Sequence, residues 1–99
     1  MNASAKNTSP KFQEETDLLT AEESSCSLIV WNDDVNTFDW VIETLIDVCG
    51  HSQEQAEQCA LLIHTTGKCI VKNGSYEFLK PKCTAILDRK IGATVEVMV

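Results

Sequence analysis

A short polar stretch between two apolar segments most constrains how this chain can fold. Residues 27–31 (Ser-Leu-Ile-Val-Trp) are apolar and partly β-branched, which is typical of a strand. Residues 32–37 (Asn-Asp-Asp-Val-Asn-Thr) carry five polar side chains, and a segment with the i, i+3, i+4, i+7 spacing of a one-faced helix follows. Its apolar positions are Phe38, Val41, Ile42, Leu45, Ile46 and Cys49. Binding groups commonly lie on loops held between core elements, so we expect the functional site at residues 32–37.

The helix boundaries are marked by capping residues. Asn36 is suited to cap the first helix, with Asp39 near the positive end of the helix dipole, and Gly50 ends the helix. Residues 52–55 (Ser-Gln-Glu-Gln) match an S-x-x-Q capping box, which begins a second helix that Gly67 ends. The second helix has a narrow apolar stripe, formed by Ala56, Cys59, Ala60 and Ile63. Two antiparallel helices joined by a short turn are therefore expected.

The C-terminal part of the chain predicts two strands around a third helix. Residues 68–72 alternate as a strand that ends at an Asn-Gly turn, and residues 93–99 alternate as a last strand. Apolar spacing predicts a helix over residues 75–90, in which Pro81 marks either the start of the regular helix or a kink. The order β-α-α-β-α-β predicts an α+β fold, a two-layer sandwich with a three-stranded antiparallel or mixed sheet and three helices on one face.

The N-terminal quarter differs in composition from the rest. Residues 1–25 are polar and acidic, with only three sizeable apolar side chains, and cannot bury enough apolar surface to offset their ordering entropy. We therefore predict a disordered acidic tail over residues 1–25 and a single folded domain over residues 26–99.

Charge and cysteine content narrow the setting and the partners. The net charge of −7 argues against nucleic acid and anionic membranes, both of which need a basic surface. No apolar run reaches the roughly 20 residues of a membrane span. Five cysteines without a C-x-x-C pair favour a reduced, cytoplasmic setting over a secreted disulfide framework.

Metal binding and catalysis are both weakly supported. Residues 32–43 match a calcium-loop template only superficially, because the position that requires glycine is Thr37. The histidines and cysteines lack paired zinc-ligand spacing. A cysteine nucleophile with His64 as its base is conceivable, but Cys49, Cys59 and Cys69 fall on predicted core faces. We therefore expect no metal, no cofactor and no enzymatic activity.

His64 becomes informative through its expected position. An antiparallel helix pair places the start of the first helix beside the end of the second, so His64 should face Asn32 and Asp33. A carboxylate, an amide oxygen and a neutral imidazole beside the apolar Phe38 and Val41 form a receptor for an ammonium group joined to a large hydrophobic group.

These residues resemble those of the ClpS family, the adaptors that recognise bacterial N-degrons and deliver them to an AAA+ unfoldase of a Clp protease. The resemblance spans residues 28–99, and its most specific elements are Val-Trp-Asn-Asp-Asp at residues 30–34 and His-x-x-Gly-Lys at residues 64–68. It implies that Asn32, Asp33 and His64 bind the free α-amino group of a substrate's first residue.

The resemblance also implies a specificity pocket for Leu, Phe, Tyr or Trp. By position its walls are Asp34, Asn36, Phe38, Val41, Ala60, Ile63 and Thr94. Phe38 and Ala60 stand where family members often carry Met, and Thr94 aligns through a segment two or three residues shorter than in familiar members.

The implied partner is the N-terminal domain of a ClpA- or ClpC-type AAA+ unfoldase. Its contact would fall on Glu77 and Lys82, with Val35 beside the degron-binding loop as a further candidate, and the N-terminal tail would take part in substrate delivery. The adaptor is expected to be a monomer. The alternative is an acidic factor-docking module, because the C-terminal domain of the ribosomal stalk protein resembles ClpS in fold.

Overall fold

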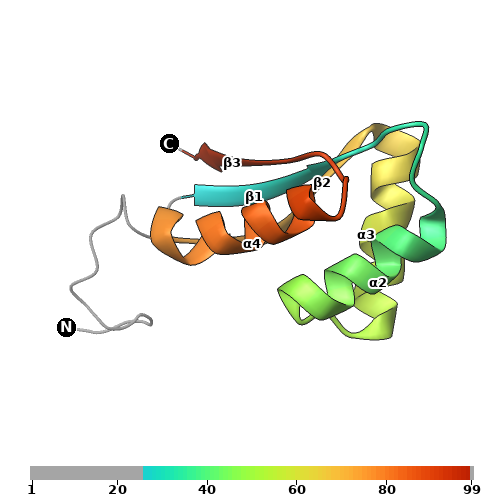
Figure 1. The fold of residues 1–99 in the computed structure, drawn as a ribbon, viewed down its shortest axis with the longest axis horizontal. Coiled ribbons are helices and arrows are strands. Elements are labelled where there is room, and N and C mark those ends of the chain that lie inside the picture. Colours follow the sequence, from blue (N-terminus) through green and yellow to red (C-terminus); the bar gives the residue numbers. More distant parts are fainter. Residues whose placement is uncertain (1–25, 99) are drawn as a thin grey trace.

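The computed structural model describes residues 26–98 and has the expected order of elements (Figure 1). The elements are β1 (Cys26–Trp31), α2 (Phe38–Cys49), α3 (Gln53–Thr66), β2 (Lys68–Gly74), α4 (Tyr76–Asp88) and β3 (Ala93–Val97). The predicted tail at residues 1–25 and Val99, the predicted end of the last strand, lie outside the described residues.

The sheet is fully antiparallel, which decides between the two expected sheet types. The strand order is β2-β1-β3, so the first strand of the chain is central. The helix α4 runs along one face of the sheet, and α2 and α3 pack near the end where β1 finishes and β2 begins (Figure 1). This is the predicted two-layer α+β fold.

The core lies between the sheet and the helices. Alternate residues of β1, Leu28 and Val30, are buried against the helices, because successive side chains of a strand point to opposite faces. They meet fully buried side chains from all three helices and the last turn, among them Leu45, Ile63, Leu79, Ile86 and Ile91. This packing fixes the positions of the loops between the elements.

The predicted ends of α2 and α3 are confirmed. Gly50 and Gly67 both adopt the left-handed conformation, with φ values of 72° and 99°, and end α2 and α3 respectively. At the start of α3, Ser52 and Gln55 form the reciprocal capping box, with distances of 3.1 Å in both directions. These caps set the length of α3 and therefore where His64 lies.

Two predictions about α2 and β2 are wrong in detail. The N-cap of α2 is Thr37, whose hydroxyl accepts from the backbone N–H of Trp40 at 3.1 Å, and not Asn36. Asn36 instead uses its side chain for contacts described below. β2 does not end at an Asn-Gly hairpin turn but continues through Gly74, and Ser75 then caps α4.

The helix α4 runs without interruption through Pro81. It begins at Tyr76, five residues before the proline, so a regular helix that starts at Lys80 is excluded. Proline lacks the N–H that would bond to the carbonyl of Glu77 and is costly in a helix interior. Burial of Leu79, Cys83 and Ile86 on the core face offsets that cost.

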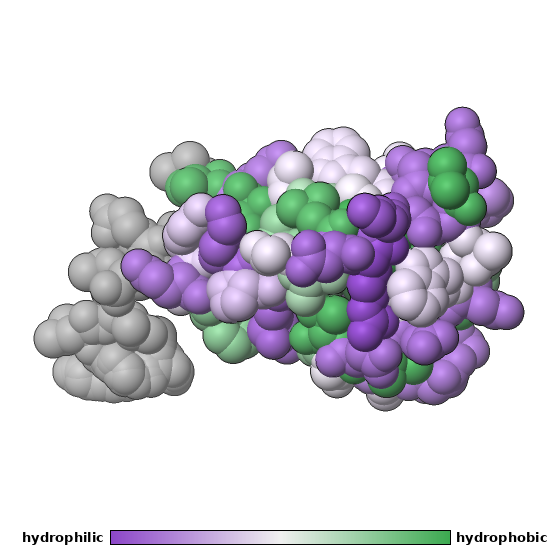
Figure 2. Space-filling view, viewed as in Figure 1, coloured by the Kyte–Doolittle hydropathy of each residue, from purple (hydrophilic) through white to green (hydrophobic). Residues whose placement is uncertain are grey.

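The surface over α4 and the sheet mixes polar and apolar residues. In the view of Figure 2, the hydrophobic side chains form separate areas between hydrophilic ones. Among residues 26–98 no helix is long and apolar enough to cross a membrane.

Candidate functional site

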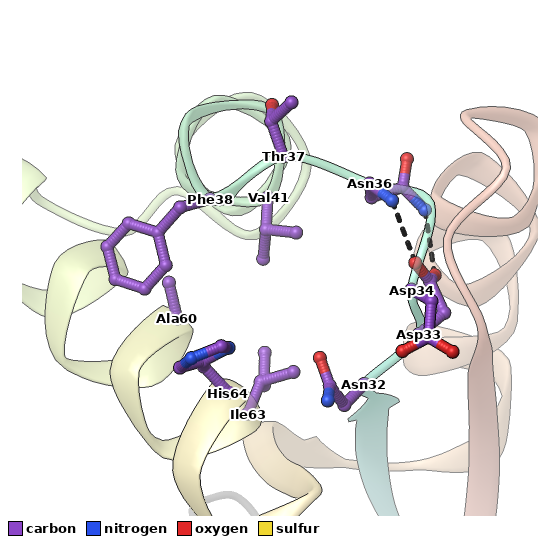
Figure 3. A pocket seen from close by; sticks show the side chains of 10 residues that line it. All are labelled: Asn32, Asp33, Asp34, Asn36, Thr37, Phe38, Val41, Ala60, Ile63 and His64. Carbon is purple, nitrogen blue, oxygen red and sulfur yellow. Dashed lines mark hydrogen bonds between the residues drawn. The ribbon is translucent and has the colours of Figure 1, made fainter.

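A pocket of about 470 Å³ lies where the loop after β1 meets the start of α2 and the end of α3. It is lined by Asn32, Asp33, Asp34, Asn36, Thr37, Phe38, Val41, Ala60, Ile63 and His64 (Figure 3). The backbone N–H of Asn32 donates to the carbonyl of Gly67 at 2.9 Å, which joins the loop to the end of α3. The expected juxtaposition of His64 with this loop is thus present in the structure.

One side of the pocket is polar, and its residues are exposed except for Asn36, which is half-buried. We call this side the polar rim, and it consists of Asn32, Asp33, Asp34, Asn36 and His64. Asn32 and His64 approach the opening from β1 and α3, respectively, with Ile63 between them (Figure 3). The rim therefore offers two carboxylates, two amides and an imidazole around one opening.

Asp33 is the most constrained member of the polar rim. Its Oδ1 accepts from the backbone N–H groups of Val35 and Asn36, both at 2.8 Å, and its Oδ2 accepts from the side-chain amide of Asn36 at 2.8 Å. The bond from the Asn36 backbone is the main cause that lowers the pKa of the Asp33 carboxyl, and burial opposes it only in part. Asp33 is therefore an anion of fixed orientation.

The opposite side of the pocket is apolar. We call it the apolar wall, and it consists of Phe38, Val41, Ala60 and Ile63, of which the last three point into the opening (Figure 3). Ala60 and Ile63 are 2% and 3% exposed and belong to the hydrophobic core. Phe38, at the entrance, is 44% exposed. An apolar group that enters the pocket would thus contact the core of the protein directly.

The structure brings together nine of the ten residues expected from the sequence to line the site. Thr94 is not among them. It lies on β3 opposite Ile29, on the sheet face that carries Trp31, and its hydroxyl accepts from the indole N–H of Trp31 at 2.9 Å. Thr37 lines the pocket but was not expected there. Its place directly before the helix, with a hydroxyl suited to an N-cap, was the available signal.

The residues expected to contact an unfoldase lie on two separate surfaces. Glu77 and Lys82 line a hollow of about 480 Å³ between α4 and the C-terminal end of α2. Lys82 Nζ donates to the carbonyl of Val48 at 3.3 Å and lies 5.0 Å from the centroid of the Phe78 ring. Val35 is 86% exposed in the loop before α2, so the length of that helix separates it from the hollow.

Four cysteines of the described region are buried in the core, and Cys59 is partly buried against it. Burial raises the pKa values of Cys49 and Cys83 and raises the pKa of Cys69 to about 12, so these thiols are poor nucleophiles at neutral pH. Within residues 26–98, no group of three or more His, Cys, Asp or Glu side chains is placed to hold a metal ion.

Comparison with known proteins gives one consistent result. Residues 21–96 match the family described as ATP-dependent Clp protease adaptor protein ClpS. The ClpS adapter protein of Nocardia farcinica is 32% identical over 75 residues, which cover 76% of this chain and 71% of the relative. That of Campylobacter jejuni is 33% identical over 79 residues, covering 80% and 82% of the two chains.

A solved structure has the same fold. Agrobacterium tumefaciens ClpS2 bound to L-phenylalaninamide matches with a TM-score of 0.70 and 18% identity, over 76% of this chain and 98% of that chain. The sequence match over most of the chain and the shared fold lead to the same conclusion. This chain belongs to the ClpS family of Clp protease adaptor proteins.

Proposed function

We propose that this protein binds the free α-amino group and the large hydrophobic first residue, Leu, Phe, Tyr or Trp, of N-degron substrates. It then delivers them to a ClpA- or ClpC-type AAA+ unfoldase. The proposal rests on the pocket itself, a cavity of about 470 Å³ in which a polar rim and an apolar wall face each other. A cavity of this kind takes a ligand with a charged end and an apolar end.

The polar rim is suited to an ammonium group. Asp33 supplies a negative charge and has one acceptor position left on Oδ2, since an ionised carboxylate has about four acceptor sites and three are used within the loop. Asn32 supplies an amide oxygen, and a neutral His64 supplies a ring nitrogen. These three acceptors correspond in number to the three N–H groups of an α-ammonium.

The apolar wall is suited to a large side chain rather than a small one. Val41, Ala60 and Ile63 present only aliphatic atoms to the cavity, and the small Ala60 leaves room that a Leu or an aromatic ring can occupy. The ring of Phe38 at the entrance can cover the bound side chain. A Ser or Ala as first residue would leave this part of the pocket unfilled.

The energetics require both halves of the pocket. Burial of one large apolar side chain contributes about 1.5–3 kcal/mol, and each charge-assisted hydrogen bond contributes about 1.5–3 kcal/mol. Association costs at least about 4 kcal/mol in lost translational and rotational freedom. The buried side chain alone does not cover this cost, and the three hydrogen bonds of the polar rim, about 4.5–9 kcal/mol together, leave at most about 5 kcal/mol after it. Tight binding therefore needs both a free amine and a hydrophobic first residue.

The ligand of the structural neighbour supports the same chemistry. L-Phenylalaninamide has a free α-amino group and an aromatic side chain, and Agrobacterium tumefaciens ClpS2 binds it. These are the two groups that the polar rim and the apolar wall of this protein are proposed to accept.

Delivery is proposed to use the two surfaces on which the sequence placed unfoldase contacts. Glu77 and Lys82 present opposite charges beside an apolar hollow on α4, and Val35 projects from the loop beside the pocket. A partner that reaches both surfaces would contact the adaptor on α4 and also beside the bound substrate.

Fluorescence titration with labelled peptides tests the proposal. A peptide that begins with Leu and has a free α-amine should bind. Its N-acetylated form should bind at least about 100-fold more weakly, from loss of two hydrogen bonds, and the same peptide beginning with Ser should bind about 10- to 150-fold more weakly, from loss of the buried side chain. Tight binding of the acetylated or the Ser-first peptide would refute the mechanism.

A further inference from the structure

Asn36 joins the carboxylate of Asp33 to a part of the chain that is distant in sequence. Its side-chain amide donates one N–H to Asp33 Oδ2 and the other to the main-chain carbonyl of Lys90, both at 2.8 Å. An amide NH₂ has two donors, so this one group serves both acceptors fully. The loop that bears Asp33 is thereby tied to the turn between α4 and β3.

That turn, residues 89–92, is itself fixed. The N–H of Lys90 bonds to the carbonyl of Leu87 at 2.9 Å, and the N–H of Ile91 bonds to the carbonyl of Ile86 at 3.3 Å, with Lys90 at φ 70°. This is the Schellman arrangement at a helix C-terminus, and its hydrophobic residue, Ile91, is 2% exposed. The carbonyl of Lys90 is therefore held by the core.

Two further bonds connect the same turn to the elements around the pocket. The backbone N–H of Trp31 donates to the carbonyl of Gly92 at 3.0 Å, and the indole N–H of Trp40 donates to the carbonyl of Arg89 at 3.0 Å. The turn thus contacts the end of β1, the loop and the first turns of α2. The turn therefore supports the polar rim through these hydrogen bonds.

We propose that Asn36 is a positioning residue for amine binding. Its amide fixes the Asp33 carboxylate against the turn at residues 89–92, so that the remaining acceptor position on Oδ2 points at the ligand. The inference rests on the proposed function and adds a residue that acts through Asp33. Without the amide of Asn36, Oδ2 loses its only bond within the loop. The carboxylate is then held through Oδ1 alone, by the two backbone N–H groups, and Oδ2 can swing about that point.

The test is a double-mutant cycle on the full chain, read as affinity for a Leu-first peptide with a free α-amine. Asn36→Ala should weaken binding about 10-fold in the wild-type background, but less than about 2-fold in an Asp33→Asn background, because a residue that acts only through Asp33 has little left to act on. Ser75→Ala, which removes the N-cap of α4, is the matched control for a loss of stability and should leave affinity unchanged.

A second readout needs no ligand. In an NMR titration, Asn36→Ala should raise the pKa of the Asp33 carboxyl, since one of the hydrogen bonds that lowers it is lost. If Asn36→Ala does not fold, Asn36→Ser, which keeps a single donor, goes through the same cycle with a smaller expected loss.

The outcomes separate this inference from the proposed function. Unchanged affinity of Asn36→Ala, or an equal loss in both backgrounds, would overturn the positioning role while leaving amine recognition intact. Failure of the wild type to bind the free-amine peptide would overturn the proposed function, and the positioning role with it.

Discussion

The polar rim and the inner part of the apolar wall face the same opening, but different forces hold them. Asp33 of the rim is exposed and Asn36 is half-buried, and both are held by hydrogen bonds within the loop and to the turn at residues 89–92. Ala60 and Ile63 of the wall are buried and are held by packing of α3 against the sheet and α2. The wall therefore contributes to stability as well as to the proposed binding, whereas the rim lies outside the hydrophobic core and contributes to the proposed binding alone.

This difference predicts separate responses to substitution, and the largest concerns Ile63. Ile63→Ala should lower the free energy of unfolding by about 2–5 kcal/mol, because it leaves a cavity in the core, and should also weaken peptide binding by removing part of the wall. Urea unfolding and peptide titration measure the two effects.

Two control variants sharpen this first prediction. Leu45→Ala removes a side chain that is 1% exposed and does not line the pocket, so it should cost similar stability at unchanged affinity of the folded protein. Asp33→Asn should show the reverse pattern. Equal losses of affinity in the two core variants would mean that the wall does not contact the ligand.

The second prediction concerns charge at the polar rim. A neutral imidazole accepts a hydrogen bond from an ammonium, whereas an imidazolium repels it, so affinity should fall about 10-fold as the pH drops from about 7.5 to about 5.5. Asp33 does not cause this loss, because its lowered pKa keeps the carboxylate ionised over the whole window. The peptide α-amine, with a usual pKa of about 7.7–8.0, becomes more charged at low pH and acts in the opposite direction.

The pH effect is checked with a variant that does not titrate. His64→Gln retains an acceptor oxygen, and its affinity should not decrease on acidification. The other histidine, His51, is buried with Nε2 2.9 Å from the carbonyl of Val71 and is present in both proteins. The same decrease in the wild type and in His64→Gln would exclude His64 as the acceptor.

The sequence predicts most of this architecture because the relevant signals are local. The spacing of residues 38–49, the capping box at residues 52–55 and the glycines that end α2 and α3 each act within one or two turns. Nine residues that line the pocket were expected there from those boundaries together with the family resemblance.

The predictions that failed depend on contacts between distant parts of the chain. Asn36 does not cap α2, since its amide bonds to a carbonyl 54 residues away, and Thr37 takes the cap instead. Thr94 was placed by alignment through a shortened segment, whereas its register opposite Ile29 directs it to the other face of the sheet. No local pattern contains the bond from Asn36 to the Lys90 carbonyl or the register of Thr94.

The smallest predicted effect tests whether the turn at residues 89–92 supports the polar rim through its main-chain atoms alone. Lys90 occupies the left-handed position after α4 that usually holds glycine, at φ 70°, and a side chain with a Cβ is strained there. Lys90→Gly should raise the free energy of unfolding by about 0.5–1 kcal/mol, a few degrees in Tm, since relief of strain outweighs the greater freedom of glycine in the unfolded chain.

The carbonyl of residue 90 that accepts from Asn36 remains in this variant, so peptide affinity should not change. A stabilised variant with weakened binding would show that the lysine side chain, and not the carbonyl, orders the rim. Unchanged affinity with higher Tm would mean that the turn supports Asp33 through its backbone alone, so that its side chains can vary while the geometry of amine recognition is kept.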